Sequence, residues 1–156
     1  MSNNQIGLPI NEASKLADKL NILLANYQLF YANSRALHWN IKGEKFFELH
    51  LKFEELYMDS FQKVDEIAER ILTLGYTPLH TFTDYLKEAK IAEAANISEA
   101  RPAVEAVLSG YKTLLELERE ILDLSGEMND EGTNALMSDY IREQEKSVWM
   151  YSAFLK

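Results

Sequence analysis

The sequence predicts an all-α protein, a single four-helix bundle with a short extra helix in its long central crossover. Four long segments repeat apolar residues at three- and four-residue steps, which is the period of an amphipathic helix. Six glycines and three prolines among 156 residues are too few for a turn-rich β fold. The first and last breaks between segments are short and the middle break is long, as in a bundle with one crossover connection.

Capping residues and polar breaks set the boundaries of the predicted helices. Gly75 ends the second helix, and Ser98 is a candidate N-cap for the third. The long helices are expected at residues 11–38, 44–74, 98–126 and 133–156, with a short helix within 82–94. Residues 11–156 are therefore expected to form one domain after a short tail of residues 1–10.

The composition excludes several kinds of site. The chain has no cysteine, which excludes disulfides, thiolate metal sites and cysteine nucleophiles and fits a reducing compartment. The N-terminus lacks the basic and apolar regions of a secretory signal, and no run approaches the ~18 apolar residues of a membrane span. We therefore expect a cytoplasmic protein with no membrane partner. The net charge of −9 repels nucleic-acid phosphates and attracts cations.

Two histidines and three carboxylates form the candidate metal site. His50 and Glu54 are four residues apart, and so are Asp65 and Glu69, so each pair lies on one side of a helix. His38, at the end of the first helix, can join the His50 pair across the short loop. Imidazole and carboxylate ligands together suit iron.

The second predicted helix has three faces on a helical wheel. The core face holds Leu49, Phe53, Leu56, Val64, Ile67, Ile71 and Leu74. The predicted solvent face holds Glu48, Lys52, Glu55, Asp59, Lys63, Glu66 and Arg70. The third arc holds the candidate ligands together with Phe47, Leu51, Met58, Phe61 and Leu72. Large apolar side chains outside the core indicate a contact with a partner.

The spacing of the ligands indicates that the partner is a second copy of the chain. Glu54 and Asp65 are separated by about 16 Å along the helix, whereas metal–ligand bonds are near ~2 Å. One ion therefore cannot bridge both pairs within one helix. An antiparallel copy would place His50 and Glu54 opposite Asp65 and Glu69 of its neighbour, which gives two equivalent sites per dimer.

A plainer interpretation of these residues stays open. Each acidic residue could be a solvated surface group, and His50 could be a core histidine with satisfied hydrogen bonds. A helical oligomer without a metal function is therefore an alternative to the metal site.

The same residues closely resemble the Dps family, the ferritin-like mini-ferritins named as DNA-binding proteins from starved cells. The resemblance runs through residues 38–43, 46–50, 65–70, 147–150 and 153–155, and it covers about residues 11–156. It implies a ferritin-like four-helix bundle that assembles into a hollow dodecamer. It also implies an enzyme, a ferroxidase that oxidises Fe(II), preferably with hydrogen peroxide, and stores ferric mineral, which protects the cell and its DNA from oxidative damage.

The resemblance also implies the ligand set. His38, His50 and Glu54 of one subunit and Asp65 and Glu69 of its two-fold neighbour match the family's ferroxidase ligands. Many members have Asp where Glu54 stands, and the extra methylene could change the site geometry. The chain lacks the Glu-x-x-His motif of larger ferritins, whose di-iron sites lie inside each bundle.

Further residues have roles implied by the resemblance, each with a plainer alternative. Trp39 resembles the family's tryptophan beside the iron site, an electron source, although it could simply pack at a helix end. Trp149 is expected at a subunit contact, and His80 is expected to be a surface residue. Acidic residues near the start of the fourth helix are candidates to line iron-entry pores, although a helix N-terminus favours acidic residues in any case. These candidates are Glu127, Asp130, Glu131 and Asp139.

Compaction of DNA in the nucleoid is the second functional hypothesis. Members that condense DNA usually use a Lys-rich mobile tail, whereas residues 1–13 contain no Lys or Arg and the first basic residue is Lys15. Twelve copies of a −9 chain would carry about −108. Direct DNA binding is therefore expected to be weak at physiological salt.

Overall fold

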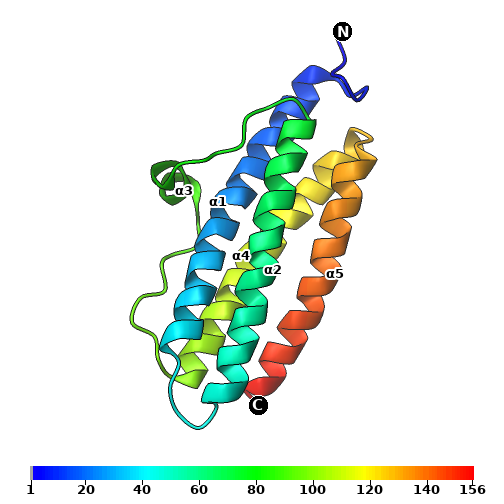
Figure 1. The fold of residues 1–156 in the computed structure, drawn as a ribbon. Helices are drawn as coiled ribbons and strands as arrows, with labels where there is room; N and C mark the ends of the chain where they lie inside the picture. The colour runs from blue at the N-terminus through cyan, green and yellow to red at the C-terminus, as the bar shows by residue number, and fades with distance from the viewer. Residues whose placement is uncertain (1) are drawn as a thin grey trace.

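The computed structural model describes residues 2–156, which form five α-helices and, within that range, no β-strand beyond one isolated bridge between Asn3 and Pro9 (Figure 1). The helices are α1 (Ile10–Asn40), α2 (Phe46–Thr73), α3 (Phe82–Glu88), α4 (Ala100–Glu127) and α5 (Glu131–Phe154). The all-α class and the four long helices predicted from the sequence are confirmed. No helix within residues 2–156 has both the length and the apolarity that a membrane crossing requires.

The four long helices form two antiparallel pairs, α1 with α2 and α4 with α5 (Figure 1). The crossover between α2 and α4 returns along the outer side of α1 and carries α3 (Figure 1). The short loop after α1 places the end of that helix beside the start of α2. This proximity is what brings residues of the two helices together in the candidate site.

Apolar stripes of the four long helices meet in one core. The core face predicted for α2 is buried, with Phe53, Ile67 and Ile71 fully inaccessible to solvent. Burial of each such side chain contributes roughly 1.5–3 kcal/mol of transfer free energy. The same core includes Leu16, Leu20, Leu23, Tyr27 and Phe30 of α1, Val104, Tyr111, Leu114 and Ile121 of α4, and Met137 and Tyr140 of α5.

The short helix of the crossover is half as long as the range predicted for it. It begins at an N-cap, because the Thr81 side chain accepts a hydrogen bond from the Asp84 backbone, and it stops at Glu88. Beyond it the chain is held extended against α1. The backbone N–H groups of Lys90 and Ile91 both donate to the side-chain oxygen of Asn26. The short helix therefore lies within the predicted range 82–94, and long-range bonds hold the chain that follows it.

Gly75 ends α2 as predicted. Its φ of 97° is left-handed, and the Tyr76 N–H donates back to the Ile71 carbonyl, which satisfies the last turn of the helix. This turn directs the chain into the crossover.

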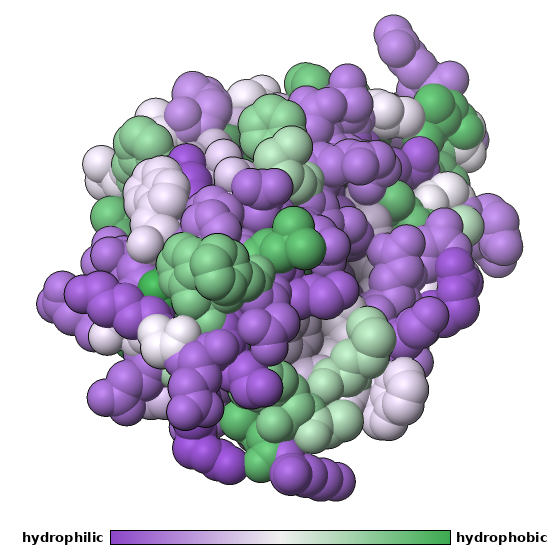
Figure 2. Space-filling model, turned by 60° about the horizontal axis from the view of Figure 1, so that its bottom comes forward, coloured by the Kyte–Doolittle hydropathy of each residue, from purple (hydrophilic) through white to green (hydrophobic). Residues whose placement is uncertain are grey.

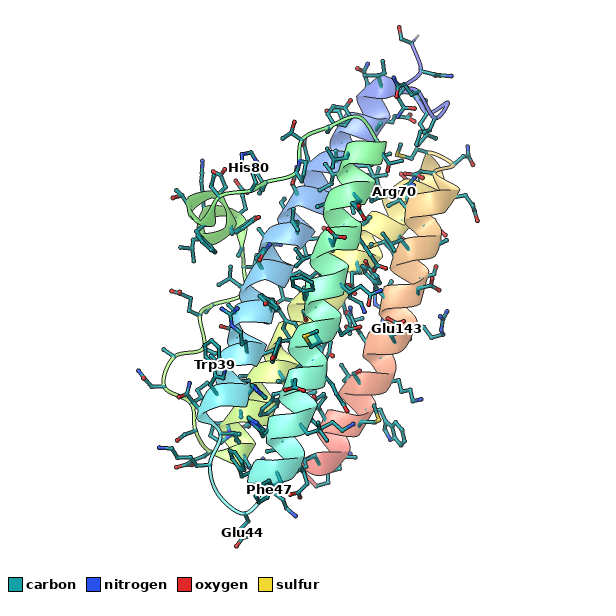
Figure 3. The ribbon with its side chains drawn as sticks, viewed as in Figure 1. Trp39, Glu44, Phe47, Arg70, His80 and Glu143 are labelled. Carbon is teal, nitrogen blue, oxygen red and sulfur yellow. The ribbon has the colours of Figure 1, made fainter. Side chains whose placement is uncertain are left out.

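The predicted solvent face of α2 is only partly solvated, which corrects the helical-wheel assignment. Lys63 is buried and pairs with Glu143 of α5. Tyr140 of α5 donates to Glu66, and Arg70 pairs with Asp130 at the start of α5. Arg70 and Glu143 are labelled in Figure 3. A helical wheel describes one helix alone, so it could not show that α5 lies beside these polar residues of α2.

Candidate metal centre

His38 and His50 hold each other in place through a reciprocal pair of hydrogen bonds. The Nδ1 atom of His38 lies 2.6 Å from the backbone oxygen of His50, and the Nδ1 atom of His50 lies 2.7 Å from the backbone oxygen of His38. Their rings stack with centroids 3.8 Å apart. The loop between α1 and α2 is short enough to put the last turn of one helix against the first turns of the next.

This pattern determines which ring nitrogen each histidine can offer to a metal. A carbonyl oxygen only accepts, so each Nδ1 carries the hydrogen and each neutral ring keeps its lone pair on Nε2. Metal-binding histidines are commonly fixed in this way, by donation of the second ring nitrogen to a carbonyl or carboxylate. Each imidazole, in its neutral form, would therefore offer Nε2 to a metal.

Glu54 lies beside the two histidines in the same chain, and we call His38, His50 and Glu54 together the half-site. One of its carboxylate oxygens lies 3.8 Å from Nε2 of His38, and about half of its side chain is exposed. His38 is itself buried. The site is thus open on the Glu54 side and closed behind the histidine rings.

Two aromatic residues that the sequence interpretation did not single out fix the histidine rings. Phe46 stacks on the His50 ring at 4.9 Å, and the Tyr57 ring meets the His38 ring edge-on at 5.3 Å. Their positions four before and seven after His50 place them on the same face of α2 and would have identified them. They give the histidines an apolar wall.

Asp65 and Glu69 lie further along the same helix and are both exposed. They do not join the histidines within one chain. Among residues 2–156 no group of three or more His, Asp or Glu side chains is arranged to hold a metal ion. One chain therefore presents the predicted ligand set in two separate parts, His38 of α1 with His50 and Glu54 of α2, and Asp65 with Glu69 further along α2.

Large apolar side chains stand exposed between and around these parts. The predicted arc of α2 is confirmed as an apolar surface, with Phe47 81% exposed. Its other members are Leu51, Met58, Phe61 and Leu72. We call this set the apolar arc. Figure 2, in which the end of the molecule near Phe47 comes forward, shows green apolar groups standing among purple polar ones.

The remaining aromatic and histidine candidates lie on the surface. Trp39 is exposed near the end of α1, beside the crossover, and the Arg35 guanidinium lies 5.0 Å from its ring (Figure 3). Trp149 is exposed on α5, and His80 is exposed in the crossover.

The four pore candidates differ in accessibility. Glu127 and Glu131 are exposed, and Asp139 is exposed and paired with Arg142. Asp130 is 2% exposed and caps α5, since it accepts hydrogen bonds from the Thr133 backbone and hydroxyl while it pairs with Arg70. We therefore leave Asp130 out of the pore considered below.

Comparison with known proteins places this geometry in a family. The ferritin-like domain family matches residues 17–156. A crystal structure of a Dps protein from Vibrio cholerae O1, described as a ferritin-like diiron-carboxylate protein, superposes with a TM-score of 0.98 at 56% identity, covering 100% of this chain and 98% of that one. The chain belongs to the Dps family.

Other Dps proteins are similar over nearly their whole length. A DNA protection during starvation protein of Porphyromonas gingivalis is 40% identical over 95% of this chain and 93% of its own. A Bacillus brevis Dps crystal structure gives a TM-score of 0.90 at 35% identity, covering 94% of this chain and 98% of that one. The family resemblance predicted from the sequence is thus confirmed, and the ferritin-like diiron-carboxylate relationship supports iron as the metal.

Proposed function

We propose that this Dps protein is a ferroxidase that oxidises Fe(II), preferably with hydrogen peroxide, and stores the ferric product. Each site is formed at a two-fold interface, from His38, His50 and Glu54 of one subunit and Asp65 and Glu69 of another. A hollow dodecamer, the assembly typical of Dps proteins, would provide the storage space. Removal of iron and peroxide would protect the cell and its DNA, and we expect this to occur in the cytoplasm.

The reciprocal hydrogen bonds of the two histidines are the observation that carries this proposal. Both rings donate through Nδ1, so the Nε2 lone pair of each ring can be offered to a metal. The Glu54 carboxylate stands beside Nε2 of His38. Neutral nitrogen and carboxylate oxygen are ligands that Fe(II) accepts.

The apolar arc supports the sharing of the site between two copies. The exposed side chains of the arc lie on the same face of α2 as both parts of the ligand set. Burial of this face by an antiparallel copy would remove apolar area from water and bring Asp65 and Glu69 to the histidines. Assembly and site formation would then be one event.

The chemistry follows from two adjacent Fe(II) ions. Each ion gives one electron to a single hydrogen peroxide molecule, the O–O bond breaks, and two protons complete two water molecules. The paired transfer avoids hydroxyl radical release. If only one electron is available from iron, exposed Trp39 could supply the second, with loss of its indole proton to solvent.

The direct test is loading of metal-free protein with Fe(II) without oxygen, followed by peroxide or air, with ferric absorbance as the readout. We expect fast oxidation with peroxide and slow oxidation with air. The double variant His38→Ala/His50→Ala should lose this activity, whereas His80→Ala, which changes an exposed histidine in the crossover, should retain it. A double variant that oxidises iron at the parent rate would disprove the assigned site.

Iron must enter the assembly before it reaches the proposed site. Exposed Glu127, Glu131 and Asp139 near the start of α5 could focus a negative field around a pore between subunits. The charge reversal Glu131→Lys should slow iron uptake at low salt and have less effect at high salt, because screening weakens such fields.

Direct DNA binding is the second candidate function, and it is favoured by the names of relatives such as the DNA protection during starvation protein of Porphyromonas gingivalis. The charge of −9 per chain opposes it. We therefore expect protection of DNA through iron oxidation. A gel-shift assay that showed salt-resistant DNA retardation would contradict this expectation.

A further inference from the structure

A second set of oxygen ligands lies between α2 and α5, apart from the histidine site, and two of its carboxylates, those of Asp59 and Glu143, are about half exposed. Lys63 of α2 points into it with a side chain only 6% exposed. Its ammonium nitrogen lies 2.8 Å from both carboxylate oxygens of Asp59, one turn earlier, and 3.1 Å from the carboxylate of Glu143 on α5. We call Lys63, Asp59 and Glu143 the lysine cluster.

Deeper in the bundle lies a third carboxylate. Glu118 of α4 is completely buried, and one of its oxygens accepts hydrogen bonds from the Tyr27 hydroxyl at 2.6 Å and the Gln144 amide at 3.0 Å. The other carboxylate oxygen of Glu118 and the amide oxygen of Gln144 have no hydrogen-bond partner among residues 2–156. Buried acceptors of this kind are costly, and a cation is the type of group that satisfies them.

The lysine cluster can be reached from solvent. A groove of about 620 Å³ between α2 and α5 is lined by Asp59, Lys63, Glu143 and Gln144, with mostly apolar walls elsewhere. Gln144 belongs to both groups, since it lines the groove and bonds to Glu118. A hydrated ion therefore has a route to these oxygens.

The charges favour a cation. The carboxylates of Asp59 and Glu143 face a single ammonium, and the buried Gln144 lines the same groove. Burial lowers the pKa of Lys63, but the hydrogen bonds and charges of Asp59 and Glu143 outweigh it, so this pKa is raised. The ammonium is thus held permanently charged. An oxygen-only ligand set of this kind otherwise suits Mg²⁺, Ca²⁺ or Mn²⁺.

We propose that the Lys63 ammonium is a built-in cation that occupies an oxygen-lined site inside the bundle and keeps divalent metal out of it. Lys63 thereby determines where metal binds. With the interior occupied by a tethered charge, iron is confined to the histidine half-sites. This last step rests on the proposed function, whereas the exclusion of metal from the bundle does not.

The experiment uses the full chain in the His38→Ala/His50→Ala background, so that the histidine site contributes little. Mn(II) binding is measured by equilibrium dialysis and by the loss of the free-ion electron paramagnetic resonance signal. Lys63→Ala removes the ammonium and leaves space, and Lys63→Arg is the matched control that keeps a positive charge. Lys63→Ser is the second open variant if Lys63→Ala does not fold, as judged by circular dichroism.

We expect Lys63→Ala or Lys63→Ser to bind about one additional Mn(II) per chain, as a single oxygen-ligand site requires. Lys63→Arg should bind no more than the background. Addition of Glu143→Gln to the open variant should weaken the new site at least tenfold. Equal Mn(II) binding by the open variant and Lys63→Arg would overturn the proposal.

Failure of the proposed function would look different. If the His38→Ala/His50→Ala background still oxidised Fe(II) at the parent rate, the histidine site would be wrong whatever the Mn(II) result. If that background lost oxidation while the open variant gained no Mn(II), only the role of Lys63 would be wrong. The two conclusions are therefore tested by separate readouts.

Discussion

At the scale of single residues, hydrogen bonds decide which atoms are available for chemistry. The backbone oxygens of His38 and His50 each accept from the other ring, which leaves Nε2 of both rings free of these bonds and Nε2 of His38 beside Glu54. The Asp130 carboxylate, in contrast, is not available to a ligand. It pairs with Arg70 and accepts hydrogen bonds from Thr133 as the N-cap of α5. Residues of similar chemical type thus have different roles, which are set by their partners.

Glu54→Gln tests the carboxylate beside His38. An uncharged amide keeps the shape but loses the anionic ligand, so we expect Fe(II) oxidation to slow roughly tenfold to a hundredfold. Glu48→Gln, at an exposed position of the same helix, is the control and should leave the rate unchanged. Stopped-flow absorbance after peroxide addition measures both. Equal rates for the two variants would remove Glu54 from the site.

Glu118 makes the stability of the protein depend on pH. Burial raises the pKa of Glu118 from 4.5 to about 7, although the hydrogen bonds from Tyr27 and Gln144 oppose this. The folded state therefore holds a proton that the unfolded chain releases, and the free energy of unfolding falls as pH rises from 4.5 towards 7. A shift of this size corresponds to about 3 kcal/mol.

Glu118→Gln should remove this pH dependence, because the amide does not ionise. We expect the variant to be more stable than the parent at pH 8 and to differ little from it near pH 4.5. Glu116→Gln, an exposed position on the same helix, should retain the parent profile. Urea unfolding across this pH range measures the difference, and parallel profiles for parent and Glu118→Gln would contradict the prediction.

At the scale of helices, the close approach of α4 to α1 depends on Gly110. A Cβ atom at this position would lie 2.6 Å from a ring carbon of Phe30, well inside contact distance. Gly110→Ala should therefore cost roughly 1–3 kcal/mol, despite the better helix propensity of alanine. Gly126→Ala, whose Cβ would meet only Asn134 at 3.5 Å, should be neutral or stabilising by up to ~1 kcal/mol. Thermal unfolding of both variants separates the steric cost of the added methyl group from the gain in helix propensity.

At the scale of the whole molecule, the proposed pairing of two copies would account for both the apolar arc and the divided ligand set. Neither feature stabilises an isolated chain, because the arc is exposed and the two parts of the ligand set lie apart. An isologous contact would use both.

Phe61→Glu tests this contact. Phe61 is 60% exposed in one chain, so a charge there should leave the bundle folded, but it would be buried without a partner in the dimer. We expect a smaller assembly by light scattering and loss of peroxide-driven Fe(II) oxidation, with helical content unchanged. Gln62→Glu, at an exposed neighbouring position, is the control. A Phe61→Glu variant that assembles and oxidises like the parent would place the contact elsewhere.

The period of the apolar residues and the spacing of the candidate ligands allowed the helices, and the separation of the ligands along α2, to be predicted from the sequence. The apolar stripes specify four long helices and the core face of α2, since local period and burial agree there. The spacing of His50, Glu54, Asp65 and Glu69 on one helix separates the ligands by a distance fixed by helix rise. That is why the exposed apolar arc of α2 could be predicted, whereas the family was predicted from the resemblance of the runs at residues 38–43, 46–50 and 65–70, and the ligand set stays a prediction.

Other features were decided only by the tertiary structure, because they depend on contacts between residues distant in sequence. Asn26 of α1 holds the crossover after α3, and the neighbouring α5 makes Lys63, predicted at the surface, a buried cation. The reciprocal bonds of His38 and His50 require the exact closure of one loop. A sequence pattern records which face of a helix is apolar, whereas only packing determines which helix lies beside its polar face.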